Sequence, residues 1–202
     1  MTERKTTMTK MNLPNTLSLI RVLLVPFFMA SALFMKSISV WGQIVPAFIF
    51  ALASFTDFLD GNIARKRNLV TDFGKFIDPL ADKFMVFGAC ITILAIDARI
   101  APVFVWVSAI VMLRELAITS LRLVIAGKEG KVIAASFFGK MKTVTQIVAV
   151  LLILLDPIFA SLSTFLASRV ISYVAMTLMA LTTVASGIDY MRAYMPLVDT
   201  NK

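Results

Sequence analysis

DFLDGNIARKRNLVTDFGKFIDPLAD, residues 57–82, places four carboxylates at two helical spacings on either side of a short basic turn. Asp57 and Asp60 are three residues apart and Asp78 and Asp82 are four apart, so each pair lies on one face of a helix. Two helices meeting here would bring the four carboxylates together. Such a cluster repels itself unless cations neutralise it, and oxygen ligands suit hard cations such as Mg2+ or Mn2+. We therefore predict a metal site on these four residues.

The chain contains no histidine and a single cysteine, Cys90. Nitrogen-rich metal sites are thus excluded, and a base that works near neutral pH must be a carboxylate, a lysine, a tyrosine or Cys90. The apolar neighbours of Cys90 predict a buried, inert thiol. The alternative interpretation of residues 57–82 is a solvated acidic loop, but such a loop gains nothing from placing its acids on one helix face.

The composition is that of a membrane protein, because 59% of the residues are hydrophobic and only 16% are charged. Most of the apolar runs are near 20 residues long, enough to cross a hydrocarbon core of about 30 Å as helices. They cover residues 16–35, 40–59, 76–96, 100–126, 143–155 and 170–188. We predict an all-α polytopic membrane protein with six transmembrane helices and a single domain, residues 1–202, whose polar segment 1–15 lies at the membrane surface.

The first apolar run could also be a signal peptide, because Ala30, Ser31 and Ala32 resemble a cleavage site. The run nevertheless continues to Met35 and contains Arg21. We therefore expect a membrane-spanning helix here.

The basic residues predict the orientation. Six spans place both termini on one side, and only Lys36, Arg99 and Arg169 fall in the connections on the other side, whereas most other basic residues lie on the side of the termini. By the positive-inside rule, the termini face the cytoplasm of the cell. Residues 57–82 then lie at the cytoplasmic mouth of the second and third spans, where a soluble substrate arrives from water and a lipid from the leaflet.

The acidic stretch also resembles a known signature. The chain matches the pattern of CDP-alcohol phosphatidyltransferases at every position: Asp57-x-x-Asp60-Gly61-x-x-Ala64-Arg65, eight residues, then Gly74-x-x-x-Asp78-x-x-x-Asp82. The resemblance implies a membrane enzyme that transfers a phosphatidyl group from CDP-diacylglycerol to an alcohol and releases CMP. It further implies two metal ions on the aspartates, Asp82 as the catalytic base, and a homodimer.

Small residues accompany the aspartates. Gly61 and Ala64 share a face with Asp57 and Asp60 and leave room for a bulky group, which the resemblance identifies as cytidine. Gly74 would do the same from the other side, unless it only allows helix packing. Further candidate contacts to CDP-diacylglycerol are Arg65, which otherwise suits a helix C-terminus, and Thr71.

A second group of charges lies in the fourth and fifth runs. Arg114 and Arg122 are eight residues apart, nearly on one face, and need a partner or a polar cavity inside a membrane. MLRELAITSLRL and FFGKMKTVTQ resemble the branch of the family whose acceptor is glycerol 3-phosphate. This implies a basic acceptor pocket that also includes Lys140 and Lys142. Alternatively, Arg114 pairs with Glu115 across helices, Arg122 snorkels to the headgroups, and the lysines are anchors.

Asn15, Ser18 and Arg21 resemble the family pattern Asn-x-x-Thr-x-x-Arg, with Ser in place of Thr. They are candidate contacts to substrate phosphate. Asn15 could instead be a helix N-cap, which would leave Arg21 unexplained. Lys83 could tune Asp82 or pair with Asp78.

Two other functions remain open. Another acceptor, such as inositol phosphate, serine or phosphatidylglycerol, would keep the aspartates and change only the basic pocket. A transporter would also carry charges inside the membrane, but it does not require Gly61 and Ala64 at their positions.

Overall fold

The computed structural model of the protein describes residues 13–67, 72–129, 137–163 and 166–197, without the side chains of residues 13, 14, 57–67, 72, 73, 75, 126–129 and 197. These residues form helices and contain no β-strand, which confirms the all-α prediction. The long helices are α1 Leu13–Ile38, α2 Ile44–Arg67, α3 Asp72–Ile96, α4 Ala101–Glu129, α5 Phe137–Leu162 and α6 Val170–Tyr194. Short 3-10 helices cover Val40–Gln43 (η1), Leu166–Ser168 (η2) and Met195–Leu197 (η3).

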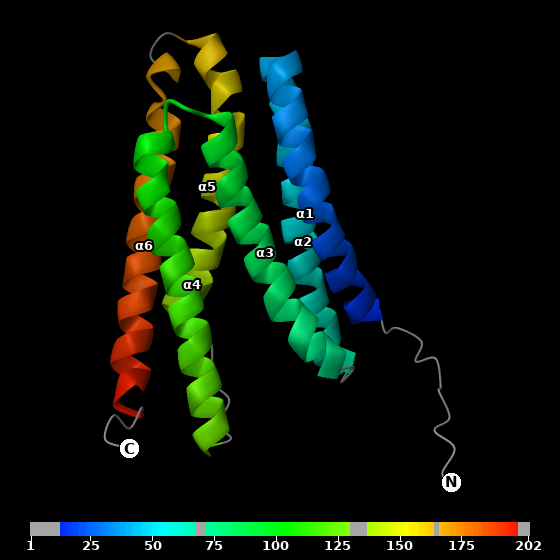
Figure 1. Ribbon diagram of the computed structural model, residues 1–202, viewed down its shortest axis with the longest axis vertical. Helices are drawn as coiled ribbons and strands as arrows, with labels where there is room; N and C mark the ends of the chain where they lie inside the picture. Colours follow the sequence, from blue (N-terminus) through cyan, green and yellow to red (C-terminus); the bar gives the residue numbers. More distant parts are fainter. Residues whose placement is uncertain (1–12, 68–71, 130–136, 164–165, 198–202) are drawn as a thin grey trace.

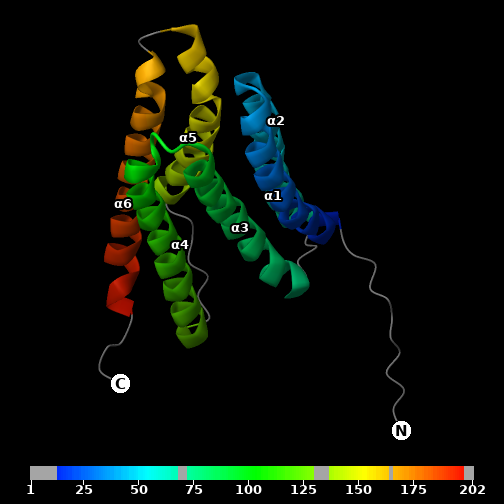
Figure 2. The ribbon, with the colours of Figure 1, turned by 45° about the horizontal axis from the view of Figure 1, so that its top comes forward.

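The six helices run alternately up and down, so α1 begins and α6 ends at the same end of the bundle (Figures 1 and 2). Within the bundle α1 packs against α2 and α3, and α6 packs against α4 and α5. Contacts of α5 with α2 and of α4 with α3 join these two groups. The arrangement places both ends of the described chain on one side, as six spans require.

Five helices, α1, α3, α4, α5 and α6, are long and apolar enough to cross a membrane. The described apolar part of the η1–α2 segment is shorter, Val40–Thr56. The chain is therefore a polytopic membrane protein.

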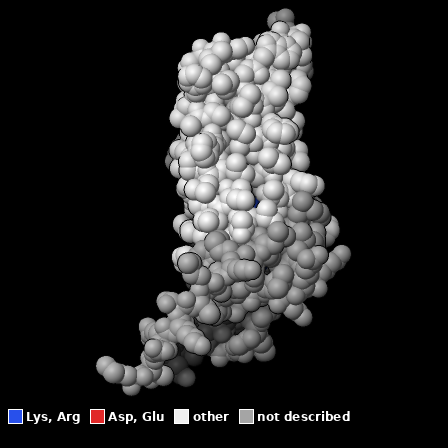
Figure 3. Space-filling model, turned by 90° about the vertical axis from the view of Figure 1, so that its right-hand side faces the viewer, with Lys and Arg blue, Asp and Glu red and all other residues white. Residues whose placement is uncertain are grey.

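The surface of the bundle is apolar. Large side chains such as Phe27, Phe48 and Trp106 point outward, and Trp106 is 73% exposed. Figure 3 shows the face formed by α1 and α2 with almost no charged atoms in the described part. The interior is filled mainly by aliphatic side chains, together with alanines and a few aromatic rings, among them Phe28 and Phe50, whose ring centroids lie 5.5 Å apart. An apolar exterior of this extent matches a lipid environment.

The starts of α5 and α1 change how polar residues near them are interpreted. Helix α5 begins at Phe137, so Lys140 and Lys142 lie inside it, where polar residues broke the hydropathy signal. Helix α1 begins at Leu13, so Asn15 lies inside the first turn, and its interpretation as an N-cap is wrong. Cys90 is buried, as predicted.

Candidate active site

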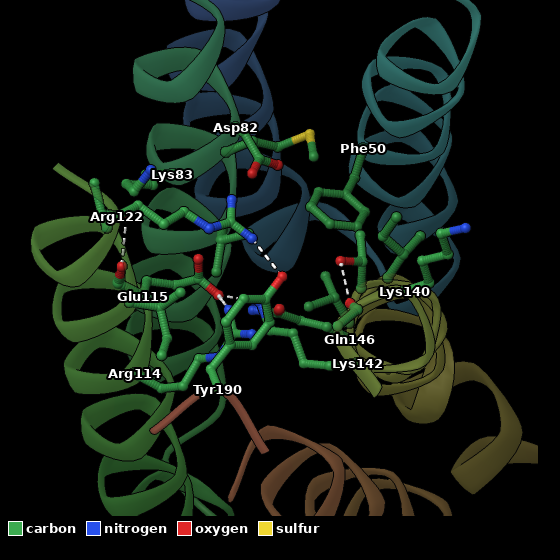
Figure 4. Close-up of a pocket in the computed structure, with 18 residues that line it drawn as sticks. Phe50, Asp82, Lys83, Arg114, Glu115, Arg122, Lys140, Lys142, Gln146 and Tyr190 are labelled. Atoms are coloured by element: carbon green, nitrogen blue, oxygen red, sulfur yellow. Dashed lines mark hydrogen bonds and ion pairs between the residues drawn. The ribbon is translucent and has the colours of Figure 1, made fainter. Parts of the chain in front are cut away.

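A cavity of about 230 Å³ opens among α2, α3, α4, α5 and α6 (Figure 4). It brings Asp82, the predicted base, together with all four residues of the predicted acceptor pocket: Arg114, Arg122, Lys140 and Lys142. Five cationic side chains and two carboxylates line this space. An excess of positive charge beside one carboxylate suits an anionic ligand that must lose a proton.

Helical spacing explains how α4 and α5 contribute. Arg114, Ile118 and Arg122 follow one another at four-residue intervals, so all three face the cavity from α4. Lys142 and Gln146 do the same from α5. The guanidinium of Arg122 donates to the hydroxyl of Tyr190 at 2.5 Å, so it points into the cavity instead of snorkelling to the headgroups.

Glu115 connects two of the cations. Lys142 donates from Nζ to Oε1 of Glu115, and Nη1 of Arg114 lies 3.3 Å from the same oxygen. Lys142 is only 4% exposed, and burying its ammonium group without such a partner would lower the stability of the protein. The interaction of Arg114 with Glu115 therefore exists within α4, while the partner of Glu115 across helices is Lys142.

Helix α6 supplies two residues that sequence reasoning missed. Ser186 accepts a hydrogen bond from Nη2 of Arg114 at 2.6 Å, and Tyr190 accepts one from Arg122. The ring of Tyr190 also lies under both guanidinium groups. A tyrosine near the end of a membrane helix is typical of an interfacial belt, so its sequence position carried no signal of this role.

The aspartate cluster is described only in part. Asp78 and Asp82 lie one turn apart on α3, and Asp78 accepts a hydrogen bond from the hydroxyl of Ser18 on α1. Asp57 and Asp60 belong to α2, but their side chains lie outside the described part. No three acidic or cysteine side chains form a metal-binding group among those described. The metal site on the four aspartates therefore stays a prediction. The chemistry of the residues fits it, because carboxylate oxygens are suitable ligands for Mg2+ or Mn2+.

The candidate nucleotide contacts lie in the same region. Gly61, Ala64 and Arg65 are in α2 without described side-chain surroundings, and Thr71 lies outside the described residues. Gly74 is buried near the start of α3. Their predicted contacts to CDP-diacylglycerol remain predictions.

Asn15, Ser18 and Arg21 are all buried within the bundle, and Arg21 is only 1% exposed. Ser18 contacts the aspartate stretch directly through Asp78, while the predicted phosphate contacts of the three residues remain predictions. Nζ of Lys83 donates to the carbonyl of Pro79 at 3.2 Å, and the side chain lines the cavity beside Asp82.

Comparisons with known proteins identify the family of the chain. The model of the CDP-alcohol phosphatidyltransferase family matches residues 11–187. The chain is 41% identical to the CDP-diacylglycerol–glycerol-3-phosphate 3-phosphatidyltransferase of Bacillus subtilis, over 89% of this chain and 93% of that protein. It is 38% identical to the Escherichia coli protein of the same name, over 72% of this chain and 78% of that protein. A probable phosphatidylglycerophosphate synthase of Mycobacterium tuberculosis is 36% identical to the chain, over 89% of this chain and 79% of that protein. The chain belongs to the CDP-alcohol phosphatidyltransferase family.

Proposed function

We propose that the protein transfers the phosphatidyl group of CDP-diacylglycerol to glycerol 3-phosphate, giving phosphatidylglycerophosphate and CMP in phospholipid biosynthesis. One observation carries the proposal: Asp82 lines the same cavity as Arg114, Arg122, Lys140 and Lys142. A phosphorylated acceptor needs both parts, cations for its phosphate and a base for its hydroxyl. The printed names of the relatives from B. subtilis and E. coli describe the same reaction.

The cations bind the acceptor phosphate. Guanidinium groups match phosphate oxygens with paired N–H donors, and such charge-assisted hydrogen bonds are among the strongest available. Glu115 already pairs with Lys142 and with one nitrogen of Arg114. Arg122 and Lys140 have no carboxylate partner among the described residues, so they would supply most of the uncompensated charge.

Asp82 takes the proton of the acceptor's primary hydroxyl. The oxygen then bonds to the phosphorus that carries the diacylglycerol, and the bond from that phosphorus to the oxygen of CMP breaks. Two divalent cations, Mg2+ or Mn2+, held by Asp57, Asp60, Asp78 and Asp82, would neutralise the pyrophosphate and make CMP a better leaving group. Gly61, Ala64, Arg65, Thr71 and Gly74 would receive the nucleotide, with Asn15, Ser18 and Arg21 near its phosphates.

The proposed setting is the cell membrane, with the cavity open to the cytoplasm. The support is the distribution of basic residues, which favours the side of the termini. There glycerol 3-phosphate arrives from water and CDP-diacylglycerol from the surrounding lipid. The family resemblance is the reason to propose a homodimer.

Purified protein tests this function directly. It is given CDP-diacylglycerol with glycerol 3-phosphate, inositol phosphate, serine or phosphatidylglycerol, and both CMP and the lipid product are measured. We expect a lipid product, phosphatidylglycerophosphate, only when the alcohol supplied is glycerol 3-phosphate. A chelator should abolish turnover, and Mg2+ or Mn2+ should restore it. Another lipid product would reassign the acceptor, and the absence of CMP with every alcohol would favour a transporter.

A further inference from the structure

Tyr190 of α6 stands beside both arginines of the cavity (Figure 4). Its ring centroid lies 5.5 Å from Cζ of Arg114 and 5.0 Å from Cζ of Arg122, and its hydroxyl accepts from Nη2 of Arg122 at 2.5 Å. One turn earlier on α6, Ser186 accepts from Nη2 of Arg114 at 2.6 Å. Tyr190 is 1% exposed and Ser186 is fully buried, so both contacts are built into the helix interface.

Two guanidinium groups in one cavity need to be held in place. They repel each other, and each long side chain has many rotamers to lose when a phosphate binds. The negative face of an aromatic ring attracts both cations at once, and the hydroxyl groups fix their direction. When the arginines are already in position, their side chains lose less conformational entropy as the ligand binds, so binding is stronger.

Tyr190 and Ser186, the hydrogen-bond acceptors on α6, are uncharged, and this matters for binding an anion. A carboxylate in their place would hold the arginines more strongly, but it would also cancel their charge, as Glu115 does for Lys142. Tyr190 and Ser186 orient Arg114 and Arg122 without adding a negative charge. Arg122, which has no carboxylate partner among the described residues, keeps its charge for the ligand, while Arg114 shares Glu115 with Lys142.

We propose that Tyr190, assisted by Ser186, is a positioning residue that sets Arg114 and Arg122 for the phosphate of the acceptor. The inference rests on the proposed function, because it assumes a phosphorylated acceptor. The match to the family model ends at residue 187, so Tyr190 lies outside the matched segment.

Steady-state kinetics of three variants test the proposal. Tyr190→Phe keeps the ring and loses the hydrogen bond, so we expect KM for glycerol 3-phosphate to rise by about 2-fold to 10-fold. Tyr190→Leu loses the ring as well, and the rise should reach at least about 10-fold. In both variants kcat and KM for CDP-diacylglycerol should stay within about 2-fold of the wild-type values. Tyr173→Phe, the same change at an exposed position of α6, should alter nothing.

Direct binding of glycerol 3-phosphate, measured by calorimetry on the same proteins, should follow the same order without depending on turnover. Ser186→Ala gives a second, milder variant and should weaken the same binding. If wild-type protein turns over glycerol 3-phosphate and both Tyr190→Phe and Tyr190→Leu behave like Tyr173→Phe, Tyr190 is not a positioning residue. Equal defects for both substrates, or a fall in kcat alone, would also overturn the proposal. Failure of the wild-type protein itself to use glycerol 3-phosphate would instead refute the proposed function.

Discussion

At the scale of single residues, Glu115 determines how the cations of the cavity are used. It accepts from Lys142 across the interface of α4 and α5 and lies 3.3 Å from Arg114 in its own helix. Both Glu115 and Lys142 are buried, so neither charge is well solvated when the other is removed. The pair therefore serves the structure of the cavity as well as its charge.

Glu115→Gln is expected to lower the free energy of unfolding by about 3 kcal/mol, because it leaves the ammonium of Lys142 buried without a counter-charge. Chemical denaturation in detergent measures this change. The double variant Glu115→Gln with Lys142→Met should recover much of the loss, since no buried charge remains. Additive effects of the two substitutions would show that the ion pair contributes no coupling.

Asp82→Asn is expected to lower kcat by about 100-fold to 10,000-fold, the usual contribution of a general base, because the amide cannot take the proton of the acceptor. Binding of glycerol 3-phosphate should persist, since the cations of the cavity are unchanged. Kinetics and calorimetry on the same preparation separate these effects. Asp189→Asn, which lies on α6 outside the cavity lining, is the matched control. A normal kcat for Asp82→Asn would remove Asp82 from the chemistry.

At the scale of helices, the packing of α3 on α1 depends on Gly88. A Cβ atom at this position would lie 2.6 Å from Cγ1 of Val25, well inside van der Waals contact. The missing side chain therefore lets the two helices approach closely, as small residues do in membrane bundles.

Gly88→Ala should consequently destabilise the protein by about 1 to 3 kcal/mol through overpacking, partly offset by the better helix propensity of alanine, up to about 1 kcal/mol. Thermal unfolding in detergent checks the direction. Adding Val25→Ala should relieve the clash and restore part of the stability. If Gly88→Ala alone left the stability unchanged or raised it, α1 would be able to shift away from the added methyl group without loss of stability.

The sequence predicted helices well and their neighbours poorly. Apolar runs located all six long helices, and the eight-residue spacing of Arg114 and Arg122 correctly placed both on one face of α4. Ser186 and Tyr190 escaped prediction because their role depends on which helix lies next to α4, which periodicity does not encode. The start of α5 was missed because Lys140 and Lys142 face a cavity, and a hydropathy pattern treats such lysines as the end of a span.

At the scale of the whole molecule, the up-and-down bundle places the start of α1 and the end of α6 on one side (Figure 1). Single cysteines test which side faces the cytoplasm, and the buried Cys90 gives little background. We expect Arg192→Cys, at the exposed end of α6, to react only with reagents inside the cell and Arg99→Cys only from outside. Labelling of the Arg192 position from outside would reverse the orientation.

The central claim is that the cavity between Asp82 and the cations of α4 and α5 binds the phosphate of the acceptor. The most direct measurement is the pair of KM values of Arg122→Ala, with Arg99→Ala at the opposite end of the bundle as control. Loss of a charge-assisted hydrogen bond of about 1.5 to 3 kcal/mol should raise KM for glycerol 3-phosphate by roughly 10-fold to 150-fold and leave KM for CDP-diacylglycerol nearly unchanged. A defect confined to CDP-diacylglycerol, or none beyond that of Arg99→Ala, would contradict the claim.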